Sequence, residues 1–215
     1  MAESRYIAIE GPIGVGKTSL ARRLAESLDA ELLLEGAEAN PFLERFYRDP
    51  RGTALPTQLF FLFQRVRQVE ELRQADIFSD TRVADFLIQK DRLFAELTLD
   101  REELRLYEQV AGSLDIEPPV PDLVIYLQAP VDTLLYRIAQ RGIDYEQRIA
   151  RAYLERLAER YARFFHDYDD APLLIVNAAT IDPIHNEEHF GMLLAEIERV
   201  RSGRHFFNPL VSALA

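Results

Sequence analysis

The sequence contains no cysteine among its 215 residues. This absence excludes disulfide bonds, cysteine-ligated zinc and cysteine nucleophiles, and it agrees with a reducing compartment. No apolar run reaches about 18 residues, and no basic-then-apolar leader precedes the first β-prone run, so neither a membrane-spanning helix nor a signal peptide is predicted. We therefore expect a cytoplasmic protein without a membrane partner.

Positive charge is scarce as well, because 36 acidic residues outnumber 25 basic ones and give a formal net charge of −11. This balance argues against a nucleic-acid partner and against a polybasic membrane patch. It does not argue against phosphate binding at one local site. The length suffices for a large buried core, and we expect residues 1–215 to form a single domain.

A glycine-rich segment near the N-terminus predicts such a phosphate site. It fits the spacing G-x-x-x-x-G-K-[ST], and its residues are Gly11, Pro12, Ile13, Gly14, Val15, Gly16, Lys17 and Thr18, with Ser19 next. The glycines let backbone N–H groups surround phosphate oxygens, Lys17 would reach the β- and γ-phosphates, and the Thr18 hydroxyl would bind Mg²⁺. A β-prone run at 5–9 precedes the segment and an amphipathic helical pattern at 19–28 follows it, as the motif requires. The sequence therefore predicts a nucleotide-binding site.

Strand-like and helix-like segments alternate along the chain, a pattern typical of βαβ units. Strands are predicted at 5–9, 30–35, 81–86, 123–127 and 173–176. Helices are predicted at 19–28, 41–47 (with Asn40 as N-cap), 56–74, from 89 onward, 101–114, 130–141, 145–165 and 186–201. The expected fold is α/β, with a five-stranded parallel sheet and helices on both of its faces.

Polar residues follow the predicted strands at their carboxyl ends, where ligands bind to parallel sheets. These residues are Glu10, Glu35, Asp85, Gln128 and Asn177. Phosphoryl transfer needs a carboxylate that accepts the proton of the attacking hydroxyl and an acidic group near Mg²⁺. Glu35 and Asp85 could fill these roles, or they could be solvated carboxylates at strand ends.

Two arginines supply candidate cations for a transferring phosphoryl group. Arg137 and Arg141 are four residues apart and share one face of a predicted helix that Gly142 ends. We interpret residues 137–148 as a lid whose closure would bring both arginines onto the phosphates and exclude water. The alternative is an ordinary basic helix end, which the helix dipole favours.

Four segments together resemble the deoxynucleoside kinase family, with the closest likeness to its bacterial deoxyadenosine/deoxyguanosine kinase branch. They are the loop 11–18 followed by Ser19-Leu20, the run Asn40-Pro41-Phe42-Leu43-Glu44-Arg45-Phe46-Tyr47-Arg48-Asp49-Pro50, the run Gln58-Leu59-Phe60-Phe61-Leu62, and residues 137–154. The resemblance covers nearly the whole chain. It implies a P-loop kinase fold, Mg²⁺ with ATP as phosphoryl donor, and transfer to the 5′-hydroxyl of a deoxynucleoside.

The resemblance also implies roles for residues around the sugar. Glu35 matches the general base that takes the proton from the 5′-hydroxyl. Tyr47 and Glu146 match the pair that holds the 3′-hydroxyl. Asp85 matches the acid of a third-strand motif and is expected near both substrate and Mg²⁺. Lys17, Arg137 and Arg141 are the expected catalytic cations.

Around the base, the resemblance implies that Gln58 reads the base edge and that Arg65 and Asp91 lie further around it. Two positions depart from the family pattern. Phe86 stands where the acid-Arg-Ser motif has its arginine, and Ile143 stands where the Arg-Gly-Arg lid has its second one. Lys90 is near enough in the sequence to substitute for the first of these.

Three further expectations complete the sequence-based hypothesis. Two alternative functions stay open: a nucleoside-monophosphate kinase, and a nucleotide-binding relative without turnover. The family resemblance implies a homodimer, and the predicted helices from Pro56 and from Arg101 carry enough apolar surface for one. The tail 205–215 is expected to pack back on the domain.

Overall fold

A parallel sheet forms the centre of the molecule. The structure, a computed structural model, describes residues 5–73, 81–114 and 117–209. In these ranges six strands pair in the order β2-β3-β1-β4-β5-β6, and every pair is parallel. The strands are β1 (Arg5–Glu10), β2 (Glu31–Leu33), β3 (Thr81–Ala84), β4 (Leu123–Gln128), β5 (Leu173–Asn177) and β6 (Arg204–Phe207). The predicted α/β fold with a parallel sheet is confirmed, and the predicted number of five strands is corrected to six.

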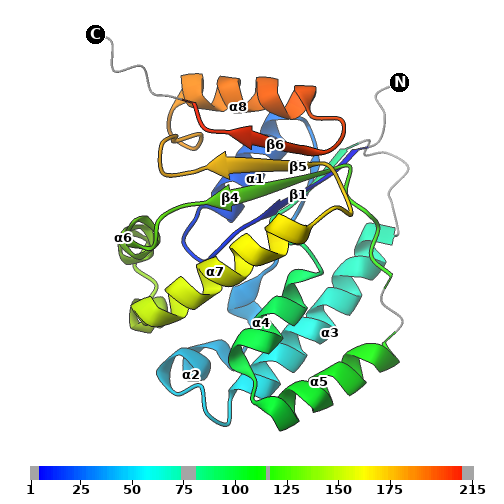
Figure 1. Ribbon diagram of the computed structural model, residues 1–215, viewed down its shortest axis with the longest axis vertical. Helices are drawn as coiled ribbons and strands as arrows, with labels where there is room; N and C mark the ends of the chain where they lie inside the picture. The colour runs from blue at the N-terminus through cyan, green and yellow to red at the C-terminus, as the bar shows by residue number, and fades with distance from the viewer. Residues whose placement is uncertain (1–4, 74–80, 115–116, 210–215) are drawn as a thin grey trace.

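Helices cover both faces of this sheet. In Figure 1, α7 crosses in front of the strands and α1 lies behind them, and α1 contacts β1, β2 and β3. The described α-helices are α1 (Lys17–Ser27), α2 (Leu43–Arg48), α3 (Ala54–Arg73), α4 (Lys90–Thr98), α5 (Arg101–Ser113), α6 (Val131–Arg141), α7 (Arg151–Asp167) and α8 (Glu187–Arg199). Two short 3₁₀ helices, η1 (Ala37–Ala39) and η2 (Glu146–Arg148), lie at the mouth of the candidate site. In the described ranges no helix is both long and apolar enough to cross a membrane.

The sequence did not predict β6. This edge strand has only four residues, whose side chains alternate between exposed and half-buried. Phe206, for example, is 70% exposed. Such a segment offers no buried run that would reveal a strand. The start of the tail therefore does pack on the domain, as a strand beside β5, whereas residues 210–215, like Gln74 at the predicted end of α3, lie outside the described residues.

Several helix starts also differ from the predictions, and two of these differences bear on the site. The helix predicted from Tyr145 begins at Arg151, because Ile149 and Ala150 are extended and separate it from η2. Asn40 does accept a hydrogen bond from the backbone of Phe42 (3.0 Å), but regular helix α2 begins only at Leu43. The same Asn40 donates to the Thr57 carbonyl at 3.1 Å. This buried residue therefore joins α2 to α3 beside the site.

The core lies where the central strands meet α1, α6, α7 and α8. Strands β1 and β4 contribute residues with no exposed surface, including Ile7, Ile9 and Ile125. Burial of such side chains stabilises the fold by about 1.5–3 kcal/mol each. The carboxyl ends of β1, β2 and β3 project from this rigid layer to one edge, where the site is built.

Candidate active site

The phosphate loop has the backbone that its glycines permit. Gly11 has φ +152° and Gly14 has φ +83°. A Cβ atom at Gly11 would lie 2.4 Å from the Leu127 carbonyl oxygen, so only glycine fits there. Helix α1 begins directly after the loop and has no side-chain cap, which leaves its first N–H groups for an anion. Lys17 Nζ donates to the Gly11 carbonyl at 2.8 Å, and burial lowers the pKa of this ammonium.

Thr18 and Asp85 meet at the end of this loop. Thr18 Oγ1 donates to Asp85 Oδ2 at 2.5 Å, while Asp85 Oδ1 accepts from the backbone N–H of Glu35 at 2.6 Å. Among the described residues no cluster of three acidic, histidine or cysteine side chains could hold a metal by itself. Two hard oxygen donors fit Mg²⁺, which takes one or two protein ligands and completes its shell with phosphate and water oxygens. Thr18 and Asp85, the two residues predicted to bind Mg²⁺, therefore lie in contact with each other.

Every polar group of Glu35 besides its N–H is also held by a named partner. Its Oε1 accepts from Arg65 Nη2, and its Oε2 accepts from Lys90 Nζ at 2.8 Å. Its carbonyl oxygen accepts from the side-chain amides of Gln64 and, at 3.2 Å, Gln68. Gln68 Oε1 in turn accepts from Arg65 Nη1 at 2.5 Å. Helices α3 and α4 thus fix a residue that belongs to neither.

These contacts set the charge of Glu35. Burial alone would raise the pKa of its carboxyl, but the ammonium of Lys90 and the guanidinium of Arg65, with Lys17 beyond them, lower it well below its ordinary range. The carboxylate is therefore ionised at neutral pH. Each of its oxygens has two lone pairs, so a ligand hydroxyl can bind although both oxygens already accept one hydrogen bond.

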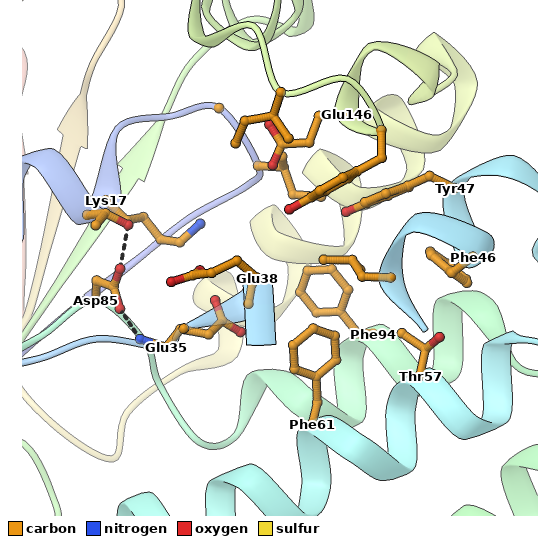
Figure 2. A pocket seen from close by; sticks show the side chains of 18 of the residues that line it. Lys17, Glu35, Glu38, Phe46, Tyr47, Thr57, Phe61, Asp85, Phe94 and Glu146 are labelled. Carbon is orange, nitrogen blue, oxygen red and sulfur yellow. Dashed lines mark hydrogen bonds between the residues drawn. The ribbon is translucent and has the colours of Figure 1, made fainter. Parts of the chain in front are cut away.

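A cavity of about 360 Å³ opens in front of Glu35 and the phosphate loop. Figure 2 shows Lys17, Glu35 and Asp85 at one side of it and aromatic rings at the other. The predicted residues that line it are Ile13, Gly14, Lys17, Thr18, Glu35, Tyr47, Gln58, Asp85, Asp91, Arg141 and Glu146. Arg65 lies behind this wall, completely buried, and touches it through Glu35 and Asp91.

Tyr47 and Glu146 come from distant parts of the chain to the same part of the cavity, as Figure 2 shows. The Tyr47 ring stacks on that of Tyr145, with centroids 6.0 Å apart and planes 8° apart. Burial raises the pKa of the Tyr47 hydroxyl well above its ordinary value, so it stays protonated and can donate. Glu146 accepts a hydrogen bond from Arg141, which ties the end of α6 to η2.

Two aromatic rings line the part of the cavity away from the phosphate loop. Phe61 of α3 and Phe94 of α4 present their rings there (Figure 2). The sequence analysis did not single them out, since aromatic residues on helices are usually core residues. The available signal was the three-residue spacing from Asp91 to Phe94, which places both on one helix face. Gln58 is 97% buried in the same wall, and within the described part of the chain its amide has no hydrogen-bond partner.

Asp91 ends this wall with one free acceptor. Its Oδ1 accepts from Arg65 Nε at 3.1 Å, whereas its Oδ2 is buried without a partner. Burial raises the pKa of this carboxyl, and the neighbouring Arg65 and Lys90 oppose the rise. Each guanidinium nitrogen of Arg65 already donates one hydrogen bond, Nε to Asp91, Nη1 to Gln68 and Nη2 to Glu35, so three of its five N–H groups are engaged within the wall.

Of the three cations predicted to be catalytic, Lys17, Arg137 and Arg141, only Arg137 does not line the cavity in the described residues. Its guanidinium donates to the carbonyls of Val15 at 3.0 Å and Ala178 at 2.7 Å, on the outer side of the phosphate loop. Arg141, one helical turn later, does line the cavity. Ile143 lines it too, without charge. In this structure only Arg141 of the two lies at the cavity, and the closure of residues 137–148 that would bring both arginines onto the phosphates stays a prediction.

Comparisons with known proteins show the family of this chain. The family model "Deoxynucleoside kinase" matches residues 7–201. A deoxyguanosine kinase of Bacillus subtilis (strain 168) is 33% identical over 93% of this chain and 99% of its own. A deoxyadenosine kinase of Lactobacillus acidophilus is 29% identical over 90% and 95%. The solved structure of deoxyadenosine kinase from M. mycoides with bound dATP has a TM-score of 0.78, at 25% identity over 90% of this chain and 99% of that one. This chain belongs to the deoxynucleoside kinase family.

Proposed function

We propose that this protein transfers the γ-phosphoryl group of ATP to the 5′-hydroxyl of a purine deoxynucleoside. The observation that carries the proposal is an ionised carboxylate, Glu35, that shares one cavity with a phosphate loop. Glu35 takes the hydroxyl proton, the 5′-oxygen bonds to the γ-phosphorus, and the bond from that phosphorus to the bridging oxygen breaks. ADP leaves with the electron pair of that bond.

The remaining groups have complementary tasks in this reaction. Lys17 turns from its own loop carbonyls to the β- and γ-phosphates, and Arg141 faces the transferring group. Thr18 and Asp85 hold Mg²⁺, which neutralises phosphate charge when bound. Tyr47 and Glu146 hold the 3′-hydroxyl, and Phe61 and Phe94 enclose the base.

The cavity wall that would face the edge of the base favours deoxyadenosine over deoxyguanosine. Asp91 Oδ2 is a buried acceptor without a partner, so it fits the exocyclic amino group of adenine. Guanine has an oxygen at the equivalent position, and two acceptors repel each other. Relatives named for each of the two nucleosides are similar to this chain, which makes the choice a question of such local contacts.

A phosphorylated acceptor fits this cavity poorly. Glu35 and Asp85, the lining carboxylates beside the phosphate loop, would face the added negative charge. The nucleoside-monophosphate kinase alternative therefore has no observation in its favour. A relative without turnover would not need Glu35 to be held ionised beside Lys17 and Asp85.

We also propose a homodimer through α3 and α5, which contact each other. Phe63 on α3 is 50% exposed and Leu106 on α5 is 46% exposed. Contact with a second copy of the chain would bury both apolar side chains. Sedimentation as a monomer at micromolar concentration would contradict the dimer. The cytoplasmic location stays a prediction from the sequence.

The test of the proposed function is a coupled ADP-release assay with Mg²⁺-ATP and one deoxynucleoside at a time. Deoxyadenosine should give the highest kcat/KM, followed by deoxyguanosine, with deoxycytidine and thymidine below both. A Lys17→Met variant serves as the control for contaminating kinases. ATP binding without ADP release in any of the four reactions would refute the proposal.

A further inference from the structure

Lys90 is a buried ammonium that no ordinary structural need explains. It is the first residue of α4, is 97% buried, and is directed inward rather than to solvent. Its Nζ lies 2.8 Å from Glu35 Oε2 and 3.8 Å from Glu10 Oε2. Lysine is among the residues least often buried, unless it is paired. This ammonium is paired with the carboxylate that faces the acceptor and with a second one behind it.

The second carboxylate is a fixed anchor. Glu10 has no exposed surface and is held on both oxygens. Its Oε1 accepts from the Gly11 N–H at 2.8 Å and from the Tyr161 hydroxyl at 3.0 Å, and its Oε2 accepts from the Leu87 N–H at 2.9 Å. Strand β1, helix α7 and the segment after β3 therefore hold Glu10 in place. Lys90 lies between this fixed anion and Glu35.

The charges around Lys90 come from β1, α1, α3, α4 itself and the segments after β2 and β3. The anions are Glu10, Glu35, Asp85 and Asp91, and the other cations are Lys17 and Arg65. With Lys90 the cluster has four carboxylates and three cations; without it, two carboxylates would have no compensating charge. Phe86, next to Asp85, is uncharged. The centroid of its ring lies 4.6 Å from the central carbon of the Arg65 guanidinium.

We propose that Lys90 is a positioning residue for Glu35: anchored by Glu10, its ammonium fixes Glu35 Oε2 toward the acceptor and holds the carboxylate ready to receive the hydroxyl proton. The inference rests on the proposed function, which assigns the proton acceptor. Lys90 does not itself take the proton. Burial would lower the pKa of its ammonium, but Glu10 and Glu35 raise it overall, so it remains charged at neutral pH.

The experiment compares three variants at one pH near neutrality. Lys90→Met removes the charge and keeps the unbranched chain, and Lys90→Arg keeps the charge. Arg92→Met is the matched control, because it removes one positive charge from the same helix at a solvent-exposed position. For each protein we would measure kcat and KM for deoxyadenosine separately, and we would determine a crystal structure to locate the Glu35 carboxylate.

We expect the Glu35 carboxylate to leave its position in Lys90→Met and kcat to fall by about 10²-fold, the usual cost of a misplacement of about 1 Å, with little change in KM. Lys90→Arg should keep Glu35 in place and restore most of kcat, and Arg92→Met should change neither. An unmoved Glu35 with wild-type kcat in Lys90→Met would overturn the proposal, and so would an equal loss of kcat in Arg92→Met. If Lys90→Met does not fold, a Lys90→Arg enzyme with Glu35 in place and near-wild-type kcat supports the positioning role, and one with a displaced Glu35 and undiminished kcat overturns it.

The two readouts separate this inference from the proposed function. The crystal structures report the contact between Lys90 and Glu35 whether or not deoxyadenosine is a substrate. A Glu35 carboxylate that is displaced in Lys90→Met, in a protein without kinase activity, would refute the function alone. Kinase activity with a Glu35 carboxylate that keeps its position in Lys90→Met would refute the positioning role alone.

Discussion

Replacement of Glu35 by glutamine is the sharpest test of the site, because it changes charge and almost nothing else. Glutamine has nearly the same shape, but it replaces one carboxylate oxygen with an NH₂ group. Both side-chain partners of Glu35, Arg65 and Lys90, are donors only. One of the two contacts must therefore become a donor facing a donor, while the other survives on the amide oxygen.

The expected loss of turnover follows from the loss of the proton acceptor. General acid–base groups contribute about 10²–10⁴-fold to a rate, which corresponds to about 2.7–5.4 kcal/mol in activation free energy. Two other carboxylates close to Glu35 are engaged, since Asp85 binds Thr18 and the Glu35 N–H and Glu10 is fully held.

The assay is ADP release at saturating Mg²⁺-ATP and deoxyadenosine near neutral pH. ATP affinity, measured by calorimetry, should stay within a few-fold of wild type, because no described contact of Glu35 involves the loop glycines. Glu44→Gln is the matched control: it removes one carboxylate from the surface of α2, outside the cavity, where it pairs only with Arg48. A Glu35→Gln enzyme that retains near-normal kcat would remove Glu35 from the mechanism.

Three further outcomes are expected. Gly14→Ala should abolish calorimetric ATP binding, because its Cβ would lie 2.9 Å from the Leu134 carbonyl oxygen at φ +83°, whereas Gly191→Ala on open α8 surface should leave binding intact. The pKa of Glu35 is lower in the folded than in the unfolded protein. Its contribution to stability is therefore complete above the unfolded pKa of about 4.3 and is lost as pH falls toward the folded value. The free energy of unfolding in urea should therefore fall less steeply with acid pH in Glu35→Gln than in wild type, and equal slopes would contradict this. Asp91→Asn should shift the kcat/KM ratio toward deoxyguanosine, since an amide N–H can donate where Oδ2 only accepts, and an unchanged ratio would refute the role of Asp91 in base choice.

The sequence predicted the sheet where burial leaves a strong pattern. The β4 run Leu123–Gln128 is apolar almost throughout because both faces of a central strand are covered, and its bounds were predicted to within one residue. At the edges that reason fails. β2 has three residues and β6 has four, and neither is wholly buried, so the sequence overestimated the first and missed the second.

The sequence predicted which strand ends meet at the site, but not which side chains line the cavity. Topology brings Glu35 and Asp85 to one edge, and the structure does place them together. Their catalytic roles stay predictions. Helical periodicity cannot separate a residue that faces a core from one that faces a cavity, which is why Phe61 and Phe94 went unnoticed. It also cannot say which side of a loop a side chain reaches, and Arg137 reaches the outer side.

The position of Glu35 in the fold explains why side chains, rather than a strand ladder, bind its backbone. It lies two residues beyond β2, the edge strand of the sheet, which pairs on one side only, with β3. A three-residue edge strand fixes its successor poorly, because the ladder ends before that residue. The backbone of Glu35 is held instead by side chains: Asp85 binds its N–H, and Gln64 and Gln68 bind its carbonyl. These three residues come from the segment after β3 and from α3, which are the elements that also carry the metal and base contacts of the proposed reaction. The proposed proton acceptor is therefore oriented by side chains of α3 and of the segment after β3 rather than by the sheet, so a substitution at Gln64 or Gln68 should alter turnover before it alters the fold.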